Sequence, residues 1–196
     1  MQTITITNLK GGVGKTTTAI NLACRLANEE KKVLLLDIDH QSNLSRFFDI
    51  TAPENVHQLF LGKDKLSPQR ISENLDIIPS DMETATINFM LVGLFDWHSR
   101  LKKRLQENGF YEKYDFCIID CPPALDMIVT NALMAADYVL IPLTTGQFAY
   151  DGLKNILDRI DEVKGDANPN VEILGILLTM VSERTRATRS VVENLK

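Results

Sequence analysis

A glycine-rich segment near the amino terminus has the residue types of a phosphate-binding loop. Residues 8–18 read N-L-K-G-G-V-G-K-T-T-T. Glycines let such a backbone curl with its N–H groups directed inward, which makes a concavity for anionic oxygens. At this spacing Lys15 reaches the β- and γ-phosphates of a nucleotide, and the Thr16 hydroxyl binds Mg²⁺. The candidate nucleotide-binding residues are Lys10, Gly11, Gly12, Val13, Gly14, Lys15, Thr16 and Thr17.

The residues on either side of the loop predict the elements that must position it. Residues 1–7 alternate with β-branched side chains, which is typical of a strand. Residues 18–29 place apolar side chains on one helical face. A strand, a glycine-rich loop and a helix in this order bring the free N–H groups and the positive dipole end of the helix to the phosphates.

Two further apolar segments end in carboxylates. Residues 33–39 read V-L-L-L-D-I-D, and residues 114–120 read Y-D-F-C-I-I-D. Runs of this kind are typical of strands covered by helices on both faces, and open α/β sheets bind their ligands at the carboxyl ends of such strands. Asp120 is therefore the candidate that holds Mg²⁺ opposite the loop. Asp37 and Asp39 are the other acidic residues expected near the metal.

The rest of the chain repeats strand and helix about six times in all. Further strands are predicted over 75–79, 138–142 and 171–181, and further helices over 42–48, 56–61, 82–108, 126–136, 148–164 and 186–196. Residues 51–73 are otherwise expected to be mixed, with loop character around 62–68. This order predicts a single doubly wound, mainly parallel α/β domain flanked by helices, spanning residues 1–196 without an N-terminal helix-turn-helix domain.

Composition excludes several classes of protein. Of the 196 residues 44% are hydrophobic and 24% charged, as in globular proteins, and the apolar runs are too short to cross a bilayer. Three cysteines are too few for a disulfide framework, which favours a reducing cytoplasm. The net charge of −5 argues against a protein coated in basic charge. Residues 183–196, however, hold four basic and two acidic residues, a net of +2.

The loop departs from the common pattern G-x-x-x-x-G-K-[ST], because Leu9 stands where the first glycine would be and Lys10 precedes the glycine pair. The run K-G-G-V-G-K-T-T resembles the deviant Walker A box of the ParA/MinD family of ATPases. The resemblance continues through D-I-D-H-Q-S-N (37–43), I-I-D-C-P-P (118–123), A-D-Y-V-L-I-P-L (136–143) and L-L-T-M-V-S-E-R-T-R (177–186). The last two segments point to the Soj-like partition branch, ParA.

That resemblance implies a cytoplasmic, nucleoid-associated ATPase that binds no membrane and hydrolyses ATP weakly by itself. ATP and Mg²⁺ would drive homodimerisation, the dimer would bind DNA without sequence preference, and a ParB-type adaptor would stimulate hydrolysis and release. Arg184, Arg186 and Arg189 are the residues we expect to contact DNA.

It also implies roles within the site. The catalytic residues would be Lys10, Lys15 and Asp39, with Asp39 orienting the attacking water. Lys10 would reach across a twofold axis into the partner's site. The metal residues would be Thr16, Asp39 and Asp120, Asp37 would support the metal shell, and residues 121–123 would form a second switch.

Departures from the family pattern leave alternatives open. His40 stands where the family has proline, and the chain ends earlier than chromosomal relatives, so it is either compact or lacks its C-terminal end. Thr179 and Met180 are then the candidates for adenine contact. Three other readings remain: a MinD-like membrane-associated spatial regulator, an iron–sulfur reductase component with cysteines paired across a dimer, and a nucleotide-gated scaffold that does not hydrolyse.

Overall fold

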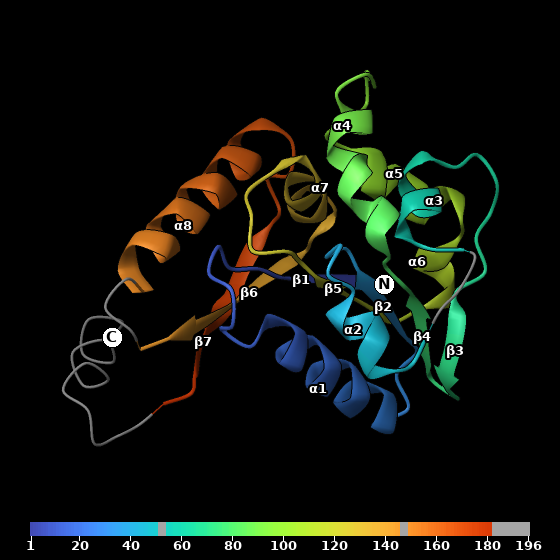
Figure 1. Ribbon diagram of the computed structural model, residues 1–196, viewed down its shortest axis with the longest axis horizontal. Coiled ribbons are helices and arrows are strands. Elements are labelled where there is room, and N and C mark those ends of the chain that lie inside the picture. The colour runs from blue at the N-terminus through green and yellow to red at the C-terminus, as the bar shows by residue number, and fades with distance from the viewer. Residues whose placement is uncertain (51–53, 146–148, 182–196) are drawn as a thin grey trace.

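The computed structural model describes residues 1–50, 54–145 and 149–181, and within them seven strands form one sheet (Figure 1). The strands are β1 (Gln2–Ile6), β2 (Val33–Asp37), β3 (Gln69–Ser72), β4 (Leu75–Ile78), β5 (Phe116–Asp120), β6 (Tyr138–Thr144) and β7 (Glu172–Thr179). Their order is β3-β4-β2-β5-β1-β6-β7, and every neighbouring pair is parallel except β3 and β4. The expected doubly wound, mainly parallel α/β fold is confirmed.

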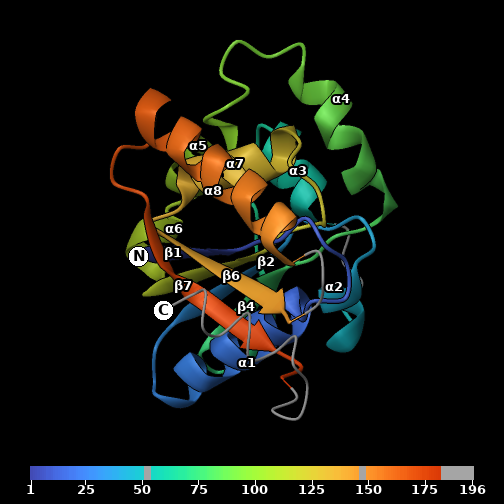
Figure 2. The same cartoon turned by 90° about the vertical axis from the view of Figure 1, so that its left-hand side faces the viewer.

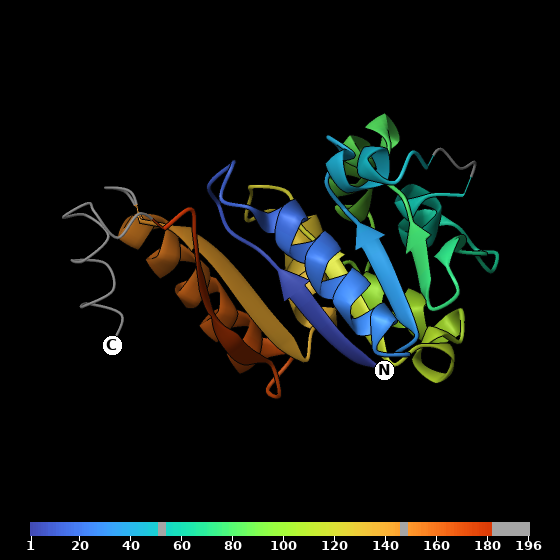
Figure 3. The same cartoon turned by 90° about the horizontal axis from the view of Figure 1, so that it is seen from below.

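Helices cover both faces of this sheet (Figure 1). They are α1 (Lys15–Asn28), α2 (Asn43–Phe47), α3 (Val56–Leu61), η1 (Met82–Thr86, a 3₁₀ turn), α4 (Ile87–Leu91), α5 (Arg100–Glu107), α6 (Phe110–Lys113), α7 (Met127–Ala135) and α8 (Ala149–Asp166). Helices α1 and α2 lie on one face, with α1 in front of the sheet in Figure 3, and the others lie on the opposite face.

The alternation of side chains along β2 explains why both faces are apolar. Val33 and Leu35 pack into the cluster that holds the alanines of α1, whereas Leu34 and Leu36 pack into the cluster that holds α5 and α7. All four side chains are fully buried. Because successive residues of a strand point to opposite faces, a strand covered on both sides must be apolar throughout.

The expected single helix over 82–108 is wrong. The structure divides it into η1, α4 and α5, with a turn over 92–99. A straight helix of that length would extend about 40 Å, far past the sheet. The turn instead folds α5 back, so that Leu91, Leu101 and Leu105 are all buried in one cluster. The exposed apolar side chains of α4 and this turn are Phe89, Met90, Val92 and Phe95.

The sheet has an additional strand that the sequence pattern did not indicate. Strand β3 lies in the segment expected to be mixed and pairs antiparallel with β4, with a register shift between Arg70 and Ser72. It has four residues of alternating partial exposure and no apolar run, so it lacks the pattern of the buried strands.

Strands β6 and β7 run side by side and end close to the first loop of the chain (Figure 2). The predicted strand over 171–181 corresponds to β7, and the predicted helix over 148–164 corresponds to α8. The helix predicted over 186–196 lies outside the described residues. Among the described helices, none is both long enough and apolar enough to cross a membrane.

Candidate functional site

The glycine-rich loop joins β1 to α1 at the carboxyl edge of the sheet. Gly12 and Gly14 have φ angles of 72° and 88°, in the left-handed region that side-chain-bearing residues rarely adopt. Gly14 is the N-cap of α1, and its carbonyl accepts from the N–H of Thr18 at 2.9 Å. The helix therefore begins at Lys15, three residues before the predicted start, and its first turn opens onto the loop.

Two side-chain hydrogen bonds tie the loop to distant parts of the chain. Asn8 donates through Nδ2 to the carbonyl of Pro142 at 2.6 Å, and its Oδ1 accepts from the N–H of Lys10 at 2.9 Å. Thr179 donates through Oγ1 to the carbonyl of Val13 at 2.8 Å. The sequence pattern gave no sign of either contact. Thr179, a candidate for adenine contact, is thus found as an anchor of the loop.

The two lysines of the loop occupy different environments. Lys15 is buried, and its Nζ donates to the carbonyl of Lys10 at 3.1 Å. Burial lowers the pKa of Lys15, while the nearby carboxyl groups of Asp120 and Asp39 oppose that shift. The side chain of Lys10 is exposed instead.

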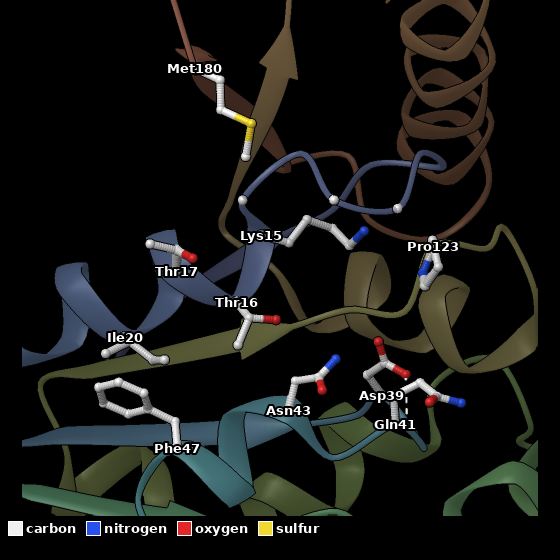
Figure 4. A pocket seen from close by; sticks show the side chains of 13 residues that line it. Lys15, Thr16, Thr17, Ile20, Asp39, Gln41, Asn43, Phe47, Pro123 and Met180 are labelled. Carbon is white, nitrogen blue, oxygen red and sulfur yellow. Dashed lines mark hydrogen bonds between the residues drawn. The ribbon is translucent and has the colours of Figure 1, made fainter.

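An open cavity of about 480 Å³ lies beside the loop. The Lys15 ammonium and the Thr16 hydroxyl both point toward the side of the cavity where Asp39 and Pro123 lie (Figure 4). Its lining residues are Gly11, Gly12, Gly14, Lys15, Thr16, Thr17, Ile20, Asp39, Gln41, Asn43, Phe47, Pro123 and Met180. Of these, Ile20 and Phe47 were not anticipated. Met180, the other candidate for adenine contact, lines the cavity.

Asp120 ends β5 directly below the loop. It is 1% exposed, and burial raises its pKa to about 7, with Asp37 and Asp39 adding repulsion. The Thr16 hydroxyl, a donor beside this carboxyl group, works against the rise in pKa. Its Oδ1 is buried without a hydrogen-bond partner among the described residues. A buried carboxylate oxygen left unpaired beside a threonine hydroxyl fits a hard cation that takes oxygen ligands.

The side-chain oxygens of Asp120 and Thr16 are ligands of the kind that Mg²⁺ takes. Within residues 1–50, 54–145 and 149–181, no group of three or more His, Cys, Asp or Glu side chains could hold a metal ion. Mg²⁺ commonly takes one or two carboxylates, phosphate oxygens and waters. Asp120 and Thr16 supply such a partial set.

The carboxyl groups of Asp37 and Asp39, at the end of β2 and just after it, lie in different surroundings. Asp39 lines the cavity, and its Oδ1 accepts from the N–H of Gln41 at 3.0 Å. Asp37 is fully buried, and its carboxyl oxygens accept from Ser45 N–H at 2.9 Å, Ser45 Oγ at 2.7 Å and Asp39 N–H at 3.2 Å. Burial raises the pKa of Asp37 to about 6. The oxygens of Asp37 thus hold the start of α2, and its support of the metal shell stays a prediction.

The remaining predictions concern three arginines and the cysteines. Arg184, Arg186 and Arg189 fall outside the described residues. Cys117 and Cys121 are buried, and Cys24 is partly buried on α1. Two buried thiols cannot meet those of a second chain, which argues against the iron–sulfur alternative.

Comparison with known proteins places this geometry among P-loop proteins. A family model described as an AAA domain matches residues 1–173. The sporulation initiation inhibitor protein Soj of Bacillus subtilis is 38% identical over 98% of this chain and 78% of its own length. The chromosome partitioning protein ParA of Myxococcus xanthus is also 38% identical, over 98% of this chain and 70% of its own.

A solved structure agrees over nearly the whole chain. Cobyrinic acid a,c-diamide synthase from Mycobacterium smegmatis, crystallised with ADP and magnesium, superposes with a TM-score of 0.92. It is 31% identical and is matched over 99% of this chain and 80% of its own.

Proposed function

Because this chain belongs to the ParA/MinD family of deviant Walker A ATPases, in its Soj-like branch, we propose that it is a partition ATPase. The chain binds ATP and Mg²⁺ and hydrolyses ATP to ADP and phosphate. In our proposal the ATP-bound form is a homodimer that binds DNA without sequence preference. A ParB-type adaptor then stimulates hydrolysis, and the protein is released from the DNA of the nucleoid.

The positions of the site residues support the roles that we propose for them. Residues 11–17 surround the phosphates with backbone N–H groups, and Lys15 neutralises their charge from within the cavity. Thr16, Asp120 and Asp39 would hold Mg²⁺, which would supply positive charge to offset that of the phosphates. Asp39 orients the water that attacks the γ-phosphate, and its place on the cavity wall supports this role.

The single observation that carries the proposal is the contrast between the two lysines. Lys15 lines the cavity and is buried, whereas Lys10 is exposed and does not line it. A cation that lies outside its own cavity is available to a second site. We therefore propose that Lys10 completes the site of a partner subunit, where such a cation accelerates phosphoryl transfer by about 10³–10⁵.

Mixing two inactive variants tests this directly. Lys10→Ala and Asp39→Ala should each abolish hydrolysis, and an equimolar mixture with ATP and Mg²⁺ should recover part of it. In the mixed dimer the Lys10→Ala subunit retains Asp39 and receives Lys10 from its partner. Lys65→Ala removes an exposed lysine elsewhere and is the control. No recovery in the mixture, or normal hydrolysis by Lys10→Ala, would reject a lysine acting between subunits.

Size measurements with ADP, with ATP and without nucleotide test the dimer. Of these three conditions, only ATP should give a dimer, and only when Mg²⁺ is present. A protein that stays monomeric with ATP would contradict the proposal.

Salt dependence tests the DNA contact. If a dimer places Arg184, Arg186 and Arg189 of both chains on phosphates, about six contacts with a slope of about −0.9 each weaken binding about 10³-fold between 50 and 200 mM salt. Arg186→Ala with Arg189→Ala should reduce that slope. The control is Arg25→Ala, which removes an exposed arginine paired with Glu29 on α1. Binding to vesicles in place of DNA would instead favour a MinD-like regulator.

A further inference from the structure

Ser80 joins the end of β4 to both acidic residues at the end of β2. It is 7% exposed. Its N–H donates to Ser45 Oγ at 2.9 Å, and that hydroxyl donates to Asp37. Its own Oγ donates to the carbonyl of Asp39 at 2.7 Å. The carboxyl group of Asp39 lines the cavity, while its carbonyl is held from the buried side.

Counting protons fixes the direction of these bonds. The hydroxyls of Ser80 and Thr84 lie 2.9 Å apart, and each has one proton. The carbonyl of Asp39 can only accept, so the proton of Ser80 goes to it and Thr84 donates to Ser80. Thr84 Oγ1 in turn accepts from the N–H of Asp81 at 3.3 Å. Each of these hydroxyl protons therefore has an acceptor, which holds the Ser80 side chain in one orientation.

The segment that Ser80 holds is a tight turn. The N–H of Ser42 donates to the carbonyl of Asp39 at 2.8 Å, which closes a turn over residues 39–42. Ser42 has a φ of 54°, an unfavourable value for serine. The second residue of the turn, His40, lacks the ring that fixes φ in proline, which is favoured at this position. The segment that follows β4 contacts this turn through the hydroxyl of Ser80.

We propose that Ser80 is a positioning residue for ATP hydrolysis. Its hydrogen bond to the main chain of Asp39 fixes where the Asp39 carboxylate lies relative to the attacking water. This inference rests on the role proposed above for Asp39. Ser80 does not line the cavity and has no contact with the phosphate loop. Its loss should therefore change the chemical step more than nucleotide binding, since small misplacements of an orienting group lower the rate.

Replacing the hydroxyl separates positioning from binding. Ser80→Ala should lower kcat about five- to tenfold, the size expected for one lost hydrogen bond. The KM for ATP and the affinity for ADP should stay within about twofold, because neither depends on the water. Ser80→Thr, which keeps the hydroxyl, should restore most of kcat. The matched control is Ser99→Ala, which removes a serine hydroxyl bonded to the carbonyl of Asp96 far from the site.

A second variant asks whether the turn is what Ser80 holds. His40→Pro should recover part of the lost kcat when added to Ser80→Ala, because proline restricts the same turn. Equal loss of kcat and of ATP affinity, with a lower melting temperature and no recovery by His40→Pro, would show a purely structural role and overturn the inference.

Asp39→Ala distinguishes a failure of the Ser80 inference from a failure of the role proposed for Asp39. If Asp39→Ala is inactive and Ser80→Ala has the kcat of the original protein, only the inference about Ser80 fails. If Asp39→Ala hydrolyses ATP normally, the proposed role of Asp39 fails and the inference fails with it.

Discussion

The Thr179 hydroxyl donates a 2.8 Å hydrogen bond to the Val13 carbonyl, across 166 residues of sequence. A Cβ placed on Gly14 would lie 3.6 Å from the Thr179 methyl group, which is ordinary van der Waals contact. The end of β7 thus contacts the phosphate loop through the Thr179 hydroxyl. The position of the loop depends on a strand at the far end of the described chain.

Removing that hydroxyl should loosen the loop. Thr179→Val keeps the shape and loses the hydrogen bond, so ATP should bind about three- to tenfold more weakly and stability should fall by about 1 kcal/mol. Isothermal titration and urea unfolding measure the two effects. Thr86→Val removes a comparable bond, to the carbonyl of Glu83, away from the loop. An equal loss of ATP affinity in both variants would contradict a specific role for Thr179.

The three glycines of the loop should differ in how well they tolerate alanine. Gly12→Ala and Gly14→Ala force a side chain into a left-handed backbone and should each cost about 1–2 kcal/mol of stability without nucleotide. Gly11 has no positive φ and open space around its Cβ position, so Gly11→Ala should cost less than about 0.5 kcal/mol. Urea unfolding of the three variants checks the order. Equal costs would mean that backbone conformation is not the cause.

The raised pKa of Asp120 predicts how stability depends on pH. Without nucleotide and Mg²⁺, the folded state holds a proton on Asp120 up to about pH 7, whereas an aspartate in the unfolded chain ionises near about pH 4. The folded state therefore binds more protons in this window, and the contribution of Asp120 to stability falls as pH rises through it. Asp120→Asn removes this dependence.

Unfolding by urea at about pH 5, 6.5 and 8 tests that sign. Asp120→Asn should be more stable than the original protein at the highest pH, and its advantage should shrink as pH falls. Asp37 also has a raised pKa, of about 6. Measuring Asp37→Asn in the same way separates its contribution to the pH dependence from that of Asp120. A difference between Asp120→Asn and the original protein that does not change with pH would contradict this account.

The turn that replaces the expected long helix predicts a contrast between two apolar residues. Leu91 is fully buried, whereas Phe95 is fully exposed. Leu91→Ala should lower stability by about 2–5 kcal/mol because it leaves a cavity. Phe95→Ala should change it by less than about 0.5 kcal/mol. Thermal or chemical unfolding of both variants measures this, and a large cost for Phe95→Ala would mean that it packs against the fold.

Sequence reasoning succeeded where the evidence is local. The glycine spacing, the alternation of β1 and the apolar runs ending in Asp39 and Asp120 each depend on near neighbours. Backbone geometry turns such patterns into elements without reference to the rest of the chain. This is why the loop, the sheet and the edge at which the acidic residues gather could be predicted.

Sequence reasoning was incomplete or wrong where the outcome depends on distant partners. Asp37 and Asp39 are two residues apart, so a continuing strand would put both carboxyl groups on one face. Strand β2 ends at Asp37, however, and the chain then turns, so that only Asp39 reaches the cavity. The helix over 82–108 failed similarly, because burial of Leu101 and Leu105 against α7 favours a reversal over continued helix.

By itself, therefore, the sequence determined the chemistry of this protein: a glycine loop with two lysines, and carboxylates at strand ends. Tertiary structure alone decided which of those groups meet. Asn8 reaches Pro142, Thr179 reaches Val13 and Ser80 reaches Asp39. These bonds form because parallel strands far apart in sequence end at one edge, and their buried polar groups need partners there. No local pattern records which partner each group finds.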